Sequence, residues 1–137
     1  MKTNCEAFTP YTKLLLRLML GVIFIYAGWG KINNIPMVEG MLTGLSIPFP
    51  AIMAWVLAIA ELVCGALLVL GLWTCFATIP VMFSIAVAFF TLHLPKEGLM
   101  GMGSLYVALI FFSLLHISAS GPGKISLDHK VLHKGNK

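Results

Sequence analysis

Two charged residues, Arg17 and Glu61, lie within long apolar stretches of this sequence. A charged side chain in apolar surroundings is costly unless a second group pairs with it. A carboxylate accepts hydrogen bonds and exchanges protons, and the planar guanidinium of an arginine matches its two oxygens. Arg17 and Glu61 are therefore the first candidates for chemistry in a buried polar site.

The sequence around Arg17 has the spacing of a helix with one special face. Arg17, Gly21, Phe24, Gly28 and Lys31 follow steps of four, three, four and three residues. This spacing places all five on one face of a helix. Glycines on that face allow a second backbone to come close. The charged stripe is therefore also the predicted packing stripe.

The depths of these residues predict which cation pairs with Glu61. Glu61 lies about ten residues beyond Ala51, or about 15 Å into the apolar run. If the two helices are antiparallel, Glu61 lies near the depth of Ile23. Arg17 is then about 9 Å away along the axis and Lys31 about 12 Å away.

We therefore expect Arg17 and Glu61 to form an inner pair, with Lys31 near the outer surface. In that case Arg17→Ala lowers thermal stability in detergent more than Lys31→Ala, because it strands a buried carboxylate. Two interpretations of the pair stay open. The pair either only fixes the register of two helices, or it lines a pocket for a ligand with carbonyl or hydroxyl groups, such as a quinone.

Histidines and methionines supply the other candidate ligands. His93, at the end of the third apolar run, is the fourth predicted ligand-binding residue, and His116 is a weaker candidate. Met100 and Met102 lie close to His93 and would suit copper, but the eight methionines are spread along the chain, which favours packing.

No metal site is predicted, because the cysteines do not have the spacing of metal ligands. His129 and His133 lie four residues apart and could bind a metal if the tail were helical, but we expect a solvated tail. The three cysteines form no CxxC motif: Cys5, Cys64 and Cys75.

Composition indicates the surroundings in which these residues must work. Of the 137 residues, 59% are hydrophobic and 10% are charged, whereas a soluble domain usually carries about 25% charged residues. A small soluble domain has too little interior to hide so much apolar surface. The chain is therefore predicted to be one integral membrane domain, residues 1–137, in contact with the lipid bilayer.

Four apolar stretches predict an all-α four-helix transmembrane bundle, because about 20 helical residues cross a bilayer. The predicted spans are approximately 14–32, 51–71, 74–93 and 100–119, followed by a polar C-terminal tail, 121–137. The second and third spans form a hairpin that turns at 71–74. Residues 33–50 are rich in turn formers, with a short interfacial helix expected over 37–45.

The lysines predict the orientation. The net charge is +4, but the cations lie mainly in the tails rather than in a basic stripe, which argues against a nucleic-acid partner. The loops between spans carry only Lys31 and Lys96. By the positive-inside rule, both termini are expected in the cytoplasm. The tail lysines are Lys2, Lys13, Lys124, Lys130, Lys134 and Lys137.

Several of these motifs together resemble the DoxX family, over about residues 14–128. The resemblance rests on four segments in the family's order: Arg17-Leu18-x-x-Gly21-x-x-Phe24-x-x-x-Gly28-x-x-Lys31, Ala60-Glu61-Leu62-x-x-Gly65, Leu70-Gly71-Leu72-Trp73-Thr74, and Gly121-Pro122-Gly123-Lys124-Ile125-Ser126-Leu127-Asp128.

The resemblance implies a four-helix protein of the bacterial inner membrane. Members of the family have been linked to quinone chemistry, thiosulfate oxidation and resistance to oxidative or electrophile stress. No established catalytic residue comes with the resemblance. The positions that match polar positions of the family pattern are Arg17, Lys31, Glu61, His93 and Asp128.

Three functions fit these residues, and the sequence leaves open whether the protein is an enzyme. One is an oxidoreductase component that binds a quinone near Arg17 and Glu61 and receives electrons from a partner protein. Another is a non-enzymatic scaffold that anchors soluble redox proteins through its basic tail. A third is a small solute carrier or efflux component with Glu61 as its protonatable group. A protein partner or homo-oligomer is expected, and no cofactor motif is evident.

Overall fold

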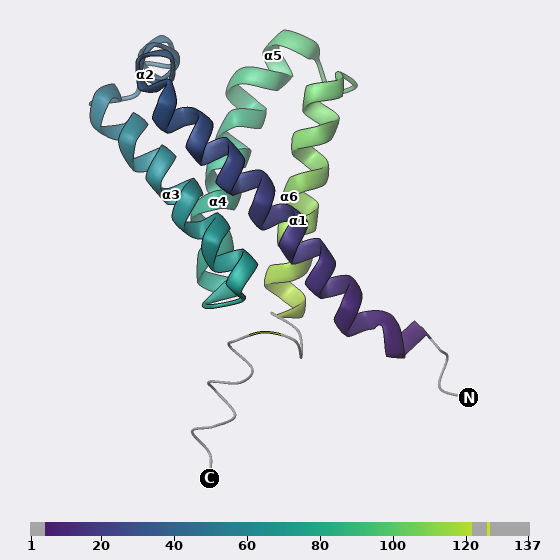
Figure 1. Ribbon diagram of the computed structural model, residues 1–137. Coiled ribbons are helices and arrows are strands. Elements are labelled where there is room, and N and C mark those ends of the chain that lie inside the picture. Colours follow the sequence, from purple (N-terminus) through teal and green to yellow (C-terminus); the bar gives the residue numbers. More distant parts are fainter. Residues whose placement is uncertain (1–4, 122–125, 127–137) are drawn as a thin grey trace.

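The computed structural model describes residues 5–121 and Ser126, and these residues form no strands. Among these residues, four helical stretches are long and apolar enough to cross a membrane. This confirms the predicted all-α fold with four spans. Figure 1 shows how the helices are arranged. Asp128, His129 and His133 lie outside the described residues. The helices are α1 (Cys5–Asn33), α2 (Ile35–Gly44), α3 (Pro50–Leu70), α4 (Thr74–Ala88), the π-helical turn η1 (Phe89–His93), α5 (Leu94–Glu97) and α6 (Met102–Ser120).

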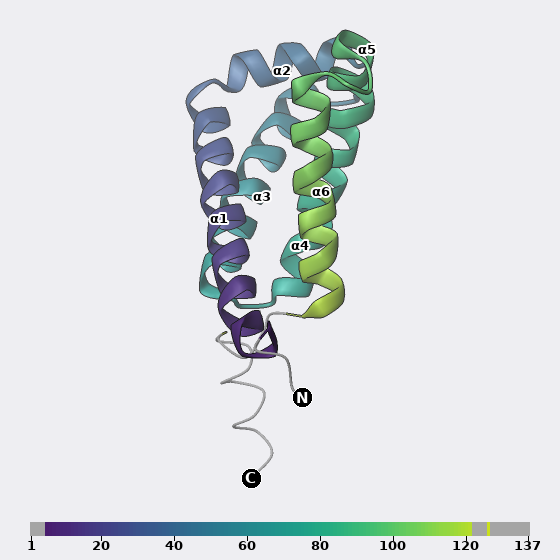
Figure 2. The ribbon, with the colours of Figure 1, turned by 90° about the vertical axis from the view of Figure 1, so that its right-hand side faces the viewer.

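The two ends of the bundle differ. α1 begins and α6 ends at one end, which we call the termini end. α2 lies across the spans at the opposite end, together with α5, and we call this the α2 end (Figure 2). The short helix α2 covers the stretch where an interfacial helix was expected.

The outer surface of the bundle is covered with large apolar side chains, as contact with lipid requires. Soluble proteins rarely expose so continuous an apolar surface. Among the side chains that are at least 60% exposed are Leu15, Ile52, Phe76, Ile79, Phe83, Phe90, Leu109 and Phe112.

The helices α1 and α3 approach so closely that glycines are required between them. A Cβ atom added to Gly28 would lie 2.7 Å from the backbone N of Leu62 and 2.9 Å from the carbonyl O of Ala58. A Cβ atom on Gly21 would lie 2.8 Å from the carbonyl O of Gly65. The predicted packing stripe of α1 therefore packs against α3, and these contacts fix the register of the two helices.

In this register α3 extends beyond the end of α1 at the α2 end. Its first turns pack instead on α2, where Val38 and Leu42 form a small core with Ala54. α2 thus packs on the first turns of α3, while further along α3 Ala58 and Leu62 lie against Gly28 of α1.

The third span continues further than predicted. After α4 the chain passes through η1 and α5, so that the helical stretch ends at Glu97 rather than near His93. The hairpin turn between α3 and α4 agrees with the prediction, because Gly71 ends α3 with a φ of 68°. Glycine reaches this left-handed conformation without the steric cost of a Cβ atom.

We predict that the two glycines nearest each other in α1 respond in opposite ways to alanine. Gly28→Ala should lower the free energy of unfolding by about 1–3 kcal/mol, because its Cβ atom would meet the α3 backbone, which cannot move aside. Gly30→Ala meets nothing within 4 Å and should be neutral or stabilising by up to about 1 kcal/mol. Unfolding in mixed detergent measures both, and equal effects would contradict the close approach of α1 and α3.

Candidate functional site

Glu61 lies near the middle of a helix that is long enough to cross the bilayer. α3 has 21 residues, or about 31 Å of helix, close to the ~30 Å thickness of the hydrocarbon core. The Glu61 side chain is on the inner face of α3, and the residue is only 4% exposed. The carboxylate is therefore buried in the bundle at about the level of the bilayer midplane.

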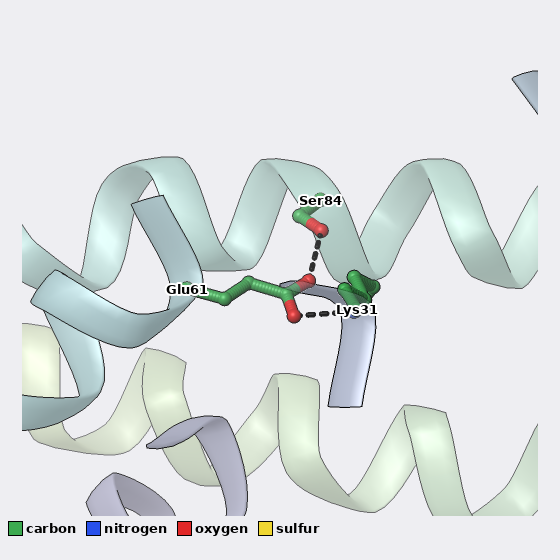
Figure 3. Close-up of polar contacts among 3 residues, drawn as sticks. All are labelled: Lys31, Glu61 and Ser84. Atoms are coloured by element: carbon green, nitrogen blue, oxygen red, sulfur yellow. Dashed lines mark hydrogen bonds and ion pairs between the residues drawn. The ribbon is translucent and has the colours of Figure 1, made fainter. Parts of the chain in front are cut away.

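Two side chains from neighbouring helices contact the Glu61 carboxylate, as Figure 3 shows. Lys31 Nζ, from the end of α1, forms an ion pair and hydrogen bond with Glu61 Oε2. Ser84 Oγ, from α4, donates a hydrogen bond of 2.9 Å to Glu61 Oε1. Each carboxylate oxygen thus has a partner, and three different helices meet at one point. We call Lys31, Glu61 and Ser84 the polar triad.

The polar triad combines three kinds of hydrogen-bonding chemistry. A lysine ammonium has three N–H donors, of which Glu61 takes one here. The Lys31 side chain is 26% exposed, against 6% for Glu61, so the remaining donors of Lys31 are the more accessible ones. The triad can therefore donate hydrogen bonds to a carbonyl oxygen through Lys31 and hold a proton on Glu61.

The prediction that Arg17 is the partner of Glu61 was wrong. The partner is Lys31, which we had expected near the outer surface. The Arg17 guanidinium lies instead against Gly71, where an added Cβ atom would be 2.5 Å from Arg17 Nη1. Ten residues of α3, or about 15 Å of helix, separate Gly71 from Glu61. Because Glu61 pairs with Lys31, Arg17→Ala is no longer expected to leave the Glu61 carboxylate without a partner.

The register of α1 on α3 explains the error. Glu61 would lie beside Ile23 if both helices started from the same membrane surface. Because α3 extends past α1 to reach α2, Gly28 lies beside Ala58 and Leu62 instead. This moves Glu61 toward the end of α1 and brings Lys31 within reach.

Arg17 belongs to a second buried polar region at the termini end. It is 3% exposed, and Thr74 and Thr78 in α4 are fully buried. Lys13 lies further toward the same end, where its Nζ donates to the carbonyl O of Ser120 at 3.1 Å. Arg17 and Glu61 were predicted to share one site, and the structure places them in different regions.

His93 also lies apart from the polar triad. It is in η1, nine residues and about 13 Å along the helical stretch from Ser84. Its Nδ1 atom lies 2.6 Å from where a Gly103 Cβ would be, next to the Glu97 carboxylate. Glu97 Oε2 accepts a hydrogen bond of 2.7 Å from the N–H of Gly103 in the first turn of α6. His93 is thus part of a polar group at the α2 end.

The other candidate ligands, Met100, Met102 and His116, are exposed. Met100 is 81% exposed and Met102 is 86% exposed, so both point away from the bundle. His116 is exposed on α6. Within residues 5–121, no three histidine, cysteine, aspartate or glutamate side chains come together as metal ligands do.

Sequence reasoning missed Ser84. Serine is common in membrane helices, and nothing in its immediate sequence distinguishes it. The signal was its position in the hairpin. The predicted turn lies at 71–74, and Glu61 and Ser84 lie about equally far from it on the two helices of the hairpin, so both are expected at about the same depth.

The chain resembles known proteins in both sequence profile and length. The profile of the DoxX family matches residues 12–94, which include all three residues of the polar triad. A Haemophilus influenzae protein without an assigned function is 30% identical over 96% of this chain and 98% of its own length.

Two further relatives carry more informative names. A Bacillus subtilis protein named "Putative oxidoreductase CatD" is 33% identical over 90% of this chain and 89% of its own length. A Mycobacterium tuberculosis protein named only as a membrane protein is 28% identical over 89% of this chain and 82% of its own length. No solved structure matches the chain.

We predict that Lys31 and Glu61 are strongly coupled in stability. Lys31→Met should lower the free energy of unfolding by about 2–3 kcal/mol, because it leaves the buried Glu61 carboxylate with Ser84 as its only partner. Breaking a fully buried ion pair costs ~3–5 kcal/mol, and we expect a smaller loss here because Lys31 is partly exposed. The double variant Lys31→Met/Glu61→Gln should recover most of this loss. Unfolding of the wild type, the two single variants and the double variant in detergent gives the coupling energy between the two residues. If the losses of the single variants simply add in the double variant, the ion pair is contradicted.

Proposed function

We propose a function from one premise: this chain belongs to the DoxX family of membrane proteins. We propose that it acts in redox or stress metabolism as a quinone-interacting oxidoreductase component or accessory subunit. The polar triad is the observation that carries this proposal. An ionisable group buried at the depth of the bilayer midplane is expensive to maintain, and such groups usually serve a function.

The chemistry of the polar triad suits a quinone. A quinone has an apolar ring that is soluble in lipid and two carbonyl oxygens that accept hydrogen bonds. Lys31 has free N–H donors for one carbonyl oxygen, and Glu61 beside it can give or take a proton. The surrounding side chains, such as Phe24 and Ile85, are apolar and suit the ring.

In this proposal the two-electron reduction of the quinone is shared with a second protein. The quinone takes up two electrons and two protons and becomes a quinol. A partner redox protein supplies the electrons. Glu61 delivers the protons one at a time to the carbonyl oxygens and is reprotonated from water. Lys31 stabilises the negative charge that develops on the oxygen before each proton arrives.

A relative's name supports the proposed redox role, and the distribution of lysines supports a membrane orientation. The oxidoreductase name of the Bacillus subtilis relative agrees with a redox role. We propose that the protein resides in the bacterial inner membrane with both termini in the cytoplasm, because the predicted tails carry six lysines and the loops two. The α2 end then faces away from the cytoplasm.

We predict that the protein binds a short-chain ubiquinone analogue in lipid nanodiscs and that binding depends on the polar triad. Glu61→Gln should weaken binding at least about tenfold, or about 1.4 kcal/mol, because a charged partner of Lys31 is lost and the site is rearranged. Ser113→Ala is the matched control, since the Ser113 hydroxyl bonds to the carbonyl O of Leu109 within its own helix. Quenching of the tryptophan fluorescence by the analogue measures the affinity.

The outcomes separate the three functions that the sequence left open. Equal quinone affinity of the wild type and Glu61→Gln would contradict a quinone site at the triad. If Glu61→Gln also kept a soluble redox protein bound during purification, a scaffold would be the better account. Proton-coupled solute flux in liposomes, lost in Glu61→Gln, would indicate a carrier instead.

A further inference from the structure

Apolar side chains are buried on both sides of the polar triad, but toward the α2 end a buried hydroxyl group lies among them. Toward the termini end, the bundle interior next to the triad is apolar. Large side chains from all four spans fill it, and each is at most 4% exposed. We call these residues the apolar layer: Leu20 and Phe24 in α1, Leu68 in α3, Val81 in α4 and Leu114 in α6.

The apolar layer separates two polar regions. On α4 the apolar layer lies between Thr78, at the termini end, and Ser84 of the triad. These two residues are six positions, or about 9 Å of helix, apart. Apart from the Cys64 thiol, the buried core around this layer is built from hydrocarbon side chains. Tightly packed hydrocarbon of this thickness excludes water. The layer therefore closes the triad off from the termini end.

Toward the α2 end, the bundle interior contains a buried hydroxyl group that needs a partner. Ser104 is 0% exposed, and its Oγ has no hydrogen-bond partner among the described residues. It lies on the same inner face of α6 as Val107 and Ile110, which are also buried. A buried hydroxyl without a protein partner is usually satisfied by an ordered water molecule.

The position of Ser104 in its helix explains why it lacks a partner. Three other helical hydroxyls bond to the carbonyl four residues earlier: Thr43 to Glu39, Thr91 to Val87 and Ser113 to Leu109. Ser104 is the third residue of α6, so the residue four positions earlier, Met100, precedes the helix. The local bond that satisfies the other hydroxyls does not form here.

Polar groups continue from Ser104 to the surface. The preceding residue, Gly103, contacts the His93 imidazole and the Glu97 carboxylate, and Glu97 is exposed. On the other side, Lys31 reaches the triad from the end of α1 and is partly exposed. The half of the bundle at the α2 end thus has polar side chains at its mouth and at its base, and between them the Ser104 hydroxyl is buried beside the apolar Val107 and Ile110.

We propose that water and protons reach Glu61 only from the α2 end, by a hydrated route past His93, Glu97 and Ser104, and that the apolar layer blocks the route from the termini end. This inference rests on the proposed function in that the triad is the site where protons are needed. Ser104 is a positioning residue that holds water on this route. Ser120, whose Oγ is also buried without a partner among the described residues, lies beyond the apolar layer at the termini end and has no part in it.

The experiment uses cysteine variants in lipid vesicles. Ser104→Cys and Val81→Cys are made in a background that lacks the three native cysteines, and an N-terminal tag reports which side of the vesicle carries the termini. A charged, membrane-impermeant thiol reagent is added to one side at a time, and intact-protein mass spectrometry measures modification. Ser104→Cys should react at least about tenfold faster from the α2 end than from the termini end. Val81→Cys, in the apolar layer, should react from neither side.

A second measurement on the native protein does not depend on any variant folding. A water-soluble carbodiimide converts a paired carboxylate and ammonium into an amide with loss of one water molecule. Applied at the α2 end it should join Glu61 to Lys31, and applied at the termini end it should not. The mass of the crosslinked peptides shows the product.

Several results would overturn the inference. They are modification of Val81→Cys, equal rates for Ser104→Cys from both sides, no reaction of Ser104→Cys from the α2 end, or a Glu61–Lys31 crosslink formed from the termini end. None of these readouts requires a quinone. If the labelling and crosslinking results contradict access from the α2 end while quinone binding still depends on Glu61, the proposed function stands and protons reach the site by another route.

Discussion

The fold is organised around a carboxylate that is buried near the middle of a membrane-spanning bundle. Glu61 cannot stay charged there without partners, because lipid offers no compensating hydrogen bonds. Lys31 supplies the opposite charge and Ser84 a hydrogen bond, so each oxygen is satisfied. The ion pair and the Ser84 hydrogen bond together require α1, α3 and α4 to meet at one level, and this requirement links the packing of the bundle to its chemistry.

Close contact between α1 and α3 decides which cation reaches that level. Gly28 and Gly21 let the two backbones touch in the observed register, because a Cβ atom at either position would collide with the α3 main chain. That register carries α3 past the end of α1, where α2 packs on it. It also places Arg17 beside the α3–α4 turn at Gly71. The same glycines therefore give the protein two separate buried polar regions, with the apolar layer between them.

The sequence predicted the fold and the identity of the key residues better than their pairing. Composition and apolar run lengths are enough for a four-span helical bundle, because lipid imposes the length of each span. Glu61 and Lys31 stood out as ionisable groups near apolar runs. Their pairing depended on a shift of a few residues in register, which the glycine contacts and α2 determine and which no count of depths contains. Ser84 and the π-helical turn at His93 gave too little local signal, since each depends on the neighbouring helices.

The contact between Lys31 and Glu61 in a bilayer is the central claim, and solid-state NMR can measure it directly. The protein would be labelled with ¹³C at the glutamate carboxyl carbons and ¹⁵N at the lysine side-chain nitrogens and studied in lipid membranes. We predict a strong dipolar coupling between one carboxyl carbon and one lysine nitrogen, absent in Glu61→Gln. No such coupling, or a coupling of the Glu61 carboxyl carbon to a ¹⁵N-labelled Arg17 guanidinium instead, would contradict the account.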